Sequence, residues 1–493
     1  MSDDADFDQG QNPAPEPQFL QIVATAGSQP RGKRARPEPT LSRVAFRVSR
    51  LMEFCSEREL QNQTGHAIHD WPLVVAKELI DNALDACEEA EVAPEITVIV
   101  EPGDTIVIQD NAGGIDADTI KSVLDYTIRV SSREAYVSPT RGAQGNALKT
   151  ILAMGYVLDC KIGGDGLGVT VIESRGVQHR VEFRVDHIDS QPKIIHTTAP
   201  SPIEVGTRIT INWPRTTLLL GYAEDRFKQL VRAYVWFNPH LSLRGRWFDR
   251  DFIIVVATNP NWEKWRPRNP TSPHWYDEAR LQRYLTAHVA RDRDLGQRRT
   301  VREFIAEFRG LSSTALQRKI LTEVGCSHQS LASFFGADRV NRAGVAKLLA
   351  AMQRLSKPVA PKLIGVIGAE HLKERFLAAG GAVETFKYQR RQGVADGVPY
   401  VVEFAFGLQH RGLARAGGAR LFATGANWSA AIANPFRSFG TTGEGLESTL
   451  AKVRANAKEP VICALHLASA RIQFADRGKS SIILSDDAEQ PDD

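Results

Sequence analysis

Cysteine is scarce in this sequence, and its few copies lie far apart. The 493 residues include five cysteines with no C-x-x-C pair among them: Cys55, Cys87, Cys160, Cys326 and Cys463. Zinc sites and disulfide frameworks need paired or closely spaced cysteines, so the sequence predicts neither. Isolated cysteines are typical of the reducing cytosol, and we expect a cytoplasmic protein.

Long apolar runs and an excess of one charge are also missing. No run approaches the ~18 residues that would span a membrane, and the residues after Met1 are acidic rather than those of a signal peptide. We therefore expect no membrane partner. The formal net charge is +3, so any contact with DNA must come from local patches rather than from bulk basicity.

Residues 72–90 carry the most informative helical pattern. Apolar residues recur along one face, while Glu78, Asn82 and Asp85 fall at i, i+4 and i+7 on a different stripe. A carboxylate there could activate a water molecule, and an amide oxygen one turn later could hold Mg²⁺. The alternative is an ordinary amphipathic helix with a solvated acidic face.

Two turns after this helix suit a purine nucleotide. Predicted strands at 96–100 and 105–109 lead into Asp110-Asn111-Ala112-Gly113-Gly114, where the carboxylate could accept a bond from a purine amino group. A plain hairpin would have a similar composition. Further on, a polar stretch at 131–139 precedes a loop with Gly142 and Gly145 that opens a helix, which is a plausible phosphate cradle.

Strands are predicted next at 156–162, 168–173, 179–185 and 206–211, and a helix at 224–236. Together these elements predict an α+β sandwich with a nucleotide between its layers. A connector rich in Pro, Trp and Asn at 260–276 then indicates a domain boundary.

Four boxes in this order resemble those of the GHKL, or Bergerat-fold, ATPases. They are Glu78-x-x-x-Asn82, Asp110-x-x-x-Gly114, Arg141-Gly142-x-x-Gly145 and Gly206-Thr207. The resemblance implies ATP and Mg²⁺ as cofactors. It makes Glu78 the general base and Asn82 the Mg²⁺ ligand, with a lid over the phosphates at 131–145. The ATP-binding residues that it implies are Asn82, Asp85, Asp110, Gly114, Ser131, Ser132, Arg141, Gly142, Gln144, Gly145, Asn146, Ala147, Lys149 and Thr207.

Two positions depart from the family pattern. Ala112 and Ala147 stand where the relatives usually have glycine. The extra methyl group is tolerable if φ stays negative at these positions.

The rest of the chain resembles the B subunit of topoisomerase VI. Residues 300–376 read as helices with turns at Gly325 and Gly336, as in that subunit's helix–two-turn–helix insert. Strands at 400–407, 419–424 and 461–474, with helices near 430–439 and 445–456, resemble its transducer domain. Lys479 matches a lysine that reaches the γ-phosphate in the relatives, so the resemblance makes it a second catalytic residue.

The resemblance also implies an organisation and a function. The implied domains are the GHKL ATPase domain at 41–262, the connector and helix–two-turn–helix domain at 263–376 and the transducer domain at 377–484. Composition predicts a disordered tail at 1–40, rich in Pro, Gln, Asp and Gly, and an acidic tail at 485–493. The implied activity is ATP hydrolysis by a nucleoid-associated clamp on double-stranded DNA. It would dimerise on binding ATP and drive strand passage with a topoisomerase VI A-like cleaving subunit.

The cleaving partner is the part of this interpretation that leaves alternatives open. We expect the long C-terminal helix that couples the B subunit to its partner to be missing, because the sequence ends soon after Lys479. A clamp that serves repair, segregation or defence without strand passage is therefore the main alternative. A GHKL sensor kinase and a chaperone are further alternatives within the fold.

Overall fold

The computed structural model describes most of the chain from Cys55 onward. The described ranges are 55–102, 105–124, 135–142, 147–186, 191–214, 218–266, 268–336, 340–410, 420–439, 444–475 and 481–483. All of them belong to one compact unit, Val48–Asp493. The predicted tails at 1–40 and 485–493 lie outside these ranges. Within the ranges, no helix is long and apolar enough to cross a lipid bilayer.

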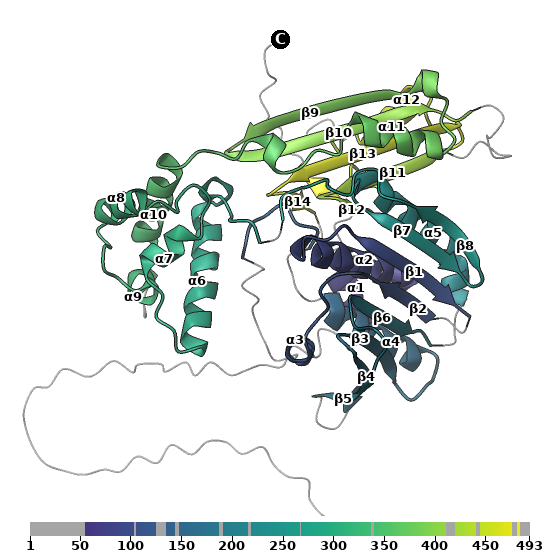
Figure 1. Cartoon of the computed structure of the whole chain (residues 1–493), viewed down its shortest axis with the longest axis horizontal. Coiled ribbons are helices and arrows are strands. Elements are labelled where there is room, and N and C mark those ends of the chain that lie inside the picture. Colours follow the sequence, from purple (N-terminus) through teal and green to yellow (C-terminus); the bar gives the residue numbers. More distant parts are fainter. Residues whose placement is uncertain are drawn as a thin grey trace, which may run out of the picture. The chain divides into compact units, whose positions relative to one another are not determined.

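An eight-stranded sheet carries the turns of the predicted nucleotide site (Figure 1). Its order is β5-β4-β3-β6-β2-β1-β7-β8, and neighbouring strands are antiparallel except β1 and β7. The strands are β1 (Glu95–Glu101), β2 (Thr105–Gln109), β3 (Gly168–Ser174), β4 (Val177–Asp186), β5 (Gln191–Pro200), β6 (Thr207–Asn212), β7 (Ser242–Trp247) and β8 (Arg250–Val255). Gln109 pairs with Arg208, so the end of β2 lies beside the start of β6.

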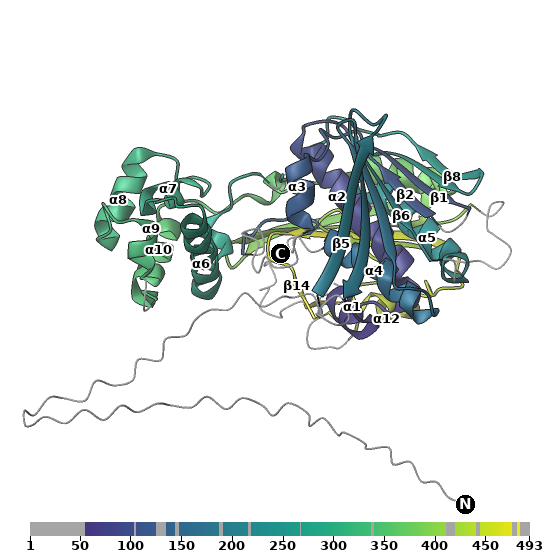
Figure 2. The same cartoon turned by 90° about the horizontal axis from the view of Figure 1, so that it is seen from below.

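Helices pack against this sheet and share its apolar core (Figure 2). Along β1, Ile96, Val98 and Val100 are buried against them, while the alternate residues are more exposed. The helices of this region are α1 (Glu57–Thr64), α2 (Trp71–Glu89), α3 (Ala117–Val123), α4 (Ala147–Lys161) and α5 (Leu218–Phe237). A 3-10 turn at Ile68–Asp70 leads into α2, whose first turn contains Pro72.

A second sheet, of five strands, lies against the other side of α5. Its order is β12-β11-β13-β10-β9, with β11 and β13 parallel. The strands are β9 (Lys387–Ala395), β10 (Val398–Leu408), β11 (Leu421–Ala426), β12 (Ser429–Ala430) and β13 (Val461–Ser469). α11 (Ala369–Ala378) packs on β10 and α5, and α12 (Leu446–Lys452) packs on β13. A short pair, β14 (Gln473–Phe474) and β15 (Ile482–Ile483), follows.

A group of helices lies between the two sheets in the sequence. It comprises α6 (Glu278–Asp294), α7 (Val301–Ala306), α8 (Thr314–Val324), α9 (Leu331–Phe335) and α10 (Arg342–Arg354), with 3-10 turns at Pro273–Trp275, Pro361–Leu363 and Val383–Thr385. Tyr284, Phe304 and Phe308 form an aromatic cluster at its centre, with the rings of Phe304 and Phe308 5.2 Å apart. Gly325 and Gly336 end α8 and α9 with positive φ, as the predicted turns require.

The α+β class and most of the strongly patterned elements are confirmed. The predicted strand at 156–162 is wrong, because residues 156–161 belong to α4 and Ile162 lies in the turn that follows. All eight residues from Ile151 to Leu158 are buried, and a helix that is apolar on every side has no periodicity to distinguish it from a buried strand. The helix predicted near 430–439 is also wrong: after β12, residues 431–439 are irregular, and Pro435 and Phe436 accept bonds from distant strand and helix residues.

Candidate nucleotide site

The α2 helix presents two different faces. Asn82 is exposed, and the Glu78 side chain on the same stripe is 32% exposed. Leu79 and Ala83, by contrast, pack into the core of the sheet. The helix therefore offers an amide and a carboxylate one turn apart beside the sheet, as the stripe predicts.

A cavity of about 280 Å³ lies beside this stripe. Four of the predicted ATP-binding residues line it: Asn82, Asp110, Gly114 and Thr207. Its apolar walls come from α2 and from Ile108 and Ile209 on neighbouring strands. The combination of apolar walls with a few converging polar groups is typical of a small-molecule site.

Asp110 is fixed at one wall of the cavity by backbone groups. Its Oδ1 accepts bonds from the backbone N–H groups of Ala112 (2.9 Å) and Thr207 (3.1 Å). Burial raises the pKa of the Asp110 carboxyl, although these two N–H groups act to lower it. Both bonds use Oδ1, so Oδ2 is the oxygen that can accept a bond from a ligand amino group.

Two glycines in these turns have conformations that side chains rarely adopt. Gly206 has φ +83°, and a Cβ there would lie 2.0 Å from the backbone O of Asp110. Gly114 has φ +76°, and its Cβ would lie 2.7 Å from Ser174 Oγ. Ala112 does not have a positive φ, so its methyl group causes no backbone strain.

Ser174 supports both turns, and the sequence analysis missed it. Its Oγ accepts a bond from Ile115 N (2.8 Å) and donates one to Gly206 O (3.0 Å). It is the last residue of β3, opposite Thr207 in the sheet. A small hydroxyl residue at a strand end is a weak signal, because the partners of such a hydroxyl depend on how the strands pair.

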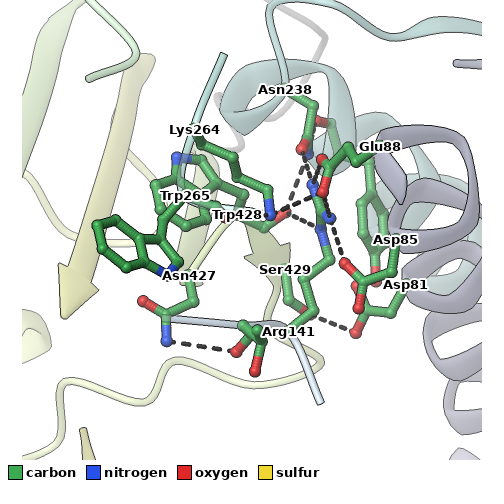
Figure 3. Close-up of polar contacts among 12 residues, drawn as sticks. Asp81, Asp85, Glu88, Arg141, Asn238, Lys264, Trp265, Asn427, Trp428 and Ser429 are labelled. Carbon is green, nitrogen blue, oxygen red and sulfur yellow. Dashed lines mark hydrogen bonds and ion pairs between the residues drawn. The ribbon is translucent and has the colours of Figure 1, made fainter. Parts of the chain in front are cut away.

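Arg141 and Asp85, two further predicted ATP-binding residues, contact each other on the adjoining side of α2 (Figure 3). The Arg141 side chain is fully buried. Its Nη1 lies 2.6 Å from Asp85 Oδ1, and its Nη2 lies 2.7 Å from Glu88 Oε1 and 2.6 Å from Asn238 Oδ1. Lys264 Nζ lies 2.7 Å from the other oxygen of Glu88.

The charges in this cluster stabilise one another. Burial alone would raise the pKa of the Glu88 carboxyl, but Arg141 and Lys264 hold that pKa well below its ordinary value. Burial lowers the pKa of His240, whose ring also contacts Glu88, and lowers that of Lys264. Sequence reasoning does not single out Glu88 or Lys264, because an acidic residue near a helix end and a lysine in a connector carry no local signal.

The remaining predicted site residues fall into two groups. Ser131, Ser132, Gln144, Gly145, Asn146 and Lys479 lie outside the described residues. The others lie within them: Ala147 begins α4, and the buried Lys149 lies in its first turn. Gly142 follows the buried Arg141, with open space where a Cβ would lie. Contacts between the nucleotide and the residues of either group stay predictions.

Replacing Gly206 with alanine tests the turn beneath Asp110. We expect Gly206→Ala to weaken nucleotide affinity at least about tenfold, because the methyl group must displace the backbone of Asp110. A fluorescent ATP analogue would measure the affinity. Gly176→Ala is the matched control: φ there is +75° but nothing lies within 4 Å of the Cβ, so affinity should change less than about twofold. Equal affinities in both variants would contradict the proposed geometry.

Removing Glu88 tests the buried cluster. Glu88→Ala should lower the free energy of unfolding by about 3–5 kcal/mol, because Arg141 and Lys264 would lose their buried counter-charge. Urea denaturation measures this change. Glu101→Ala, at an exposed strand end, should cost less than about 0.5 kcal/mol. A loss that is equally small at Glu88 would show that the cluster does not stabilise the fold.

Comparison with known proteins points the same way as the four boxes. No protein-family model matches the sequence. The chain is 25% identical over 350 residues to the B subunit of type 2 DNA topoisomerase 6 from Archaeoglobus fulgidus, covering 67% of this chain and 53% of that protein. It is 28% identical over 225 residues to the Natronomonas pharaonis protein of the same name, covering 44% of this chain and 26% of that protein. It is 40% identical over 77 residues to that of Methanosarcina mazei, covering 15% and 12%.

The chain thus spans about half the length of the first of these relatives, and less of the others. Among solved structures, it matches the Aquifex aeolicus MutL ATPase domain complexed with ADP at 10% identity, over 80% of this chain and 91% of that one, with a TM-score of 0.34. At such a score the structural likeness carries no argument about function. The sequence similarity confirms the resemblance that the four boxes indicate: this chain is similar to the B subunits of type 2 DNA topoisomerase 6.

Proposed function

We propose that the chain binds ATP with Mg²⁺ beside α2, hydrolyses it, and works as a dimerising DNA clamp of the type IIB topoisomerase B-subunit kind. One observation carries the proposal: a single cavity collects Asn82, Asp110, Gly114 and Thr207 from three separate boxes. The pairing of β2 with β6 brings Asp110 and Thr207 together, and Asn82 of α2 borders the same cavity, so polar groups suited to an adenine nucleotide converge on one space.

The adenine would occupy the apolar part of this cavity. Ile108 and Ile209 would contact the faces or edges of the ring, and Asp110 Oδ2 would accept a bond from the exocyclic amino group. The backbone N–H groups that hold Oδ1 fix the carboxylate before the ligand arrives, so little ordering is required on binding. Thr207 supports Asp110 through its backbone N–H group.

Asn82 fits the protein ligand of a nucleotide-bound Mg²⁺. Its side chain is exposed at the cavity, and amide oxygens are suitable Mg²⁺ ligands. Among the described residues, no group of three or more His, Cys, Asp or Glu side chains could hold a metal ion. A site with one protein ligand suits Mg²⁺, which usually binds through phosphates and waters as well. When bound, the ion would neutralise charge on the phosphates.

Glu78 would act as the general base. It precedes Asn82 by one turn on the same stripe, so its carboxylate would face the phosphate end of the nucleotide. There it could orient a water molecule and take its proton as the terminal phosphate is attacked. Its partial exposure lets water reach the carboxylate.

The lid predicted at 131–145 would complete the site, together with the glycine loop that begins at Arg141. We propose that Arg141 anchors the start of this loop through Asp85 and Glu88, since its guanidinium is fully buried. The backbone from Gly142 to Lys149 would then approach the phosphates, with Ser131, Ser132, Gln144, Gly145, Asn146 and Ala147 as further contacts. Lys479 would bond to the γ-phosphate and make the closed state depend on ATP.

Binding of ATP would favour a homodimer of two N-terminal regions around double-stranded DNA. The support is the similarity to subunits named for a DNA topoisomerase. Strand passage would further require a cleaving subunit of the topoisomerase VI A kind. The alternative is a clamp that traps DNA for repair, segregation or defence without cleavage.

Two substitutions distinguish binding from turnover. Glu78→Ala should keep nucleotide affinity within about threefold while lowering kcat by roughly 10²- to 10⁴-fold, since it removes only the base. Asp110→Ala should lose affinity itself, because it removes the adenine contact. Steady-state phosphate release and analogue binding measure the two effects. Full turnover in Glu78→Ala, or unchanged affinity in Asp110→Ala, would contradict the proposed site.

A plasmid assay with the unaltered protein distinguishes strand passage with a cleaving subunit from DNA trapping without cleavage. Supercoiled plasmid is incubated with ATP and the protein, with and without a candidate cleaving partner. Relaxation that needs the partner, ATP and Glu78 supports the topoisomerase function. ATP-dependent trapping of closed circular DNA without relaxation, in the presence of every candidate partner, favours the alternative.

A further inference from the structure

The face of α2 that carries Lys77 and Asp81 contacts the second sheet, through the turn between β11 and β12. This turn consists of Ala426, Asn427, Trp428 and Ser429, with Ala426 paired to Ser429. Asn427 (φ 47°) and Trp428 (φ 63°) both have left-handed backbones, the conformation of a tight type I′ hairpin turn. Two such residues without glycine are costly unless the surroundings hold them.

Several elements hold the turn in place. Trp428 is fully buried and packs over Lys264 Nζ, 4.9 Å from the ring centre. Its backbone N–H donates to His466 Nε2 (2.8 Å), and its carbonyl oxygen accepts from Asn238 Nδ2 (2.9 Å). The turn is therefore fixed to the same buried cluster that holds Arg141, as Figure 3 shows.

Ser429 then completes a closed set of bonds with two residues of α2. Its Oγ accepts from Lys77 Nζ (2.7 Å) and donates to Asp81 Oδ2 (2.7 Å), while Lys77 Nζ lies 2.7 Å from the same Oδ2. The Tyr234 hydroxyl, from α5, lies 2.8 Å from Asp81 Oδ1. All four side chains are buried.

Lys77 keeps its charge in this environment and lies next to the proposed base. Burial acts to lower its pKa, but Asp81 and Glu78 raise that pKa above its ordinary value. Its Nζ lies 4.0 Å from Glu78 Oε1, beyond hydrogen-bond distance. The ammonium group thus forms its short hydrogen bonds with Asp81 and Ser429 rather than with Glu78.

We propose that Ser429 is a positioning residue for ATP hydrolysis: by binding Lys77 it keeps this lysine away from Glu78, and so couples the second sheet to the general base. The inference rests on the proposed function, in which Glu78 activates water. When Ser429 withdraws, Lys77 loses one of its two close partners and moves onto the Glu78 carboxylate. A carboxylate engaged by an ammonium group is a weaker base and is less free to orient water.

The structure leaves room for such a movement. A second cavity of about 280 Å³ adjoins the turn, bordered by Lys77, Thr140, Asn427 and Ser429 among others. Asn427 Nδ2 also contacts Thr140 O (3.4 Å), immediately before the loop that carries Arg141. A shift of the turn would thus affect both Glu78 and the segment at Thr140 and Arg141.

The test is the kinetics of Ser429→Ala in the full chain. We expect kcat to fall about tenfold, the effect of one lost hydrogen bond to a charged group, with KM and analogue affinity within about twofold. Ser429→Thr keeps the hydroxyl and should restore kcat to within about threefold. Ser448→Ala removes a serine hydroxyl that bonds to Gly445 at the start of α12, and should change neither quantity.

Thermal unfolding of each variant confirms that it is folded, and Glu78→Ala is assayed alongside. If Glu78→Ala is inactive but Ser429→Ala keeps kcat within twofold of the unaltered protein, the coupling is refuted while the proposed function stands. A loss of affinity equal to the loss of kcat/KM, with kcat kept, would likewise refute it. If Glu78→Ala keeps full turnover, the proposed base fails, and the role of Ser429 fails with it.

Discussion

The buried pairing of Arg141 with Glu88 is the constraint on which the rest of the structure depends. A buried guanidinium without counter-charges would cost several kcal/mol, so Glu88, Asp85 and Asn238 must stay in place around it. Lys264 adds a second cation to the same carboxylate. The cluster thereby joins α2, the end of α5, the segment at Arg141 and the segment at Lys264.

The position of α2 follows from this constraint. One stripe of the helix borders the cavity with Asn82, and another is held by the charged cluster and by the turn that carries Ser429. A single helix therefore borders the proposed nucleotide site and contacts the second sheet. A displacement of α2 by a bound nucleotide would act on β12 directly, through Lys77, Asp81 and Ser429.

Sequence reasoning predicts the parts of the site that are local. Asp110 and Gly114 lie within five residues of each other at a strand end, and the stripe on α2 is a matter of helical spacing. Thr207, which lines the same cavity as Asp110, can be predicted by resemblance because the Gly206-Thr207 box is also short. Ser174 cannot, because its partners depend on how β3 and β6 pair.

The contacts between distant segments have no such signal. Arg141 and Glu88 are 53 residues apart, and Lys77 and Ser429 are 352 apart, so neither pair has a spacing that a single sequence reveals. Residues 156–162 resemble a strand because α4 is buried on every side from 151 to 158, so this part of the helix lacks an amphipathic period. At 430–439, a run rich in alanine favours a helix, but the tight turn at Asn427 and Trp428 and the proline at 435 impose an irregular path.

In the proposed mechanism, α2 transmits the state of the nucleotide site to the turn at Asn427–Ser429. Amide hydrogen exchange with and without a non-hydrolysable ATP analogue and Mg²⁺ measures this most directly. We expect altered protection at residues 427–430 and 466–469, in addition to the cavity turns at 110–115 and 206–209. Changes confined to the cavity turns, with the second sheet unaffected at saturating analogue, would contradict it.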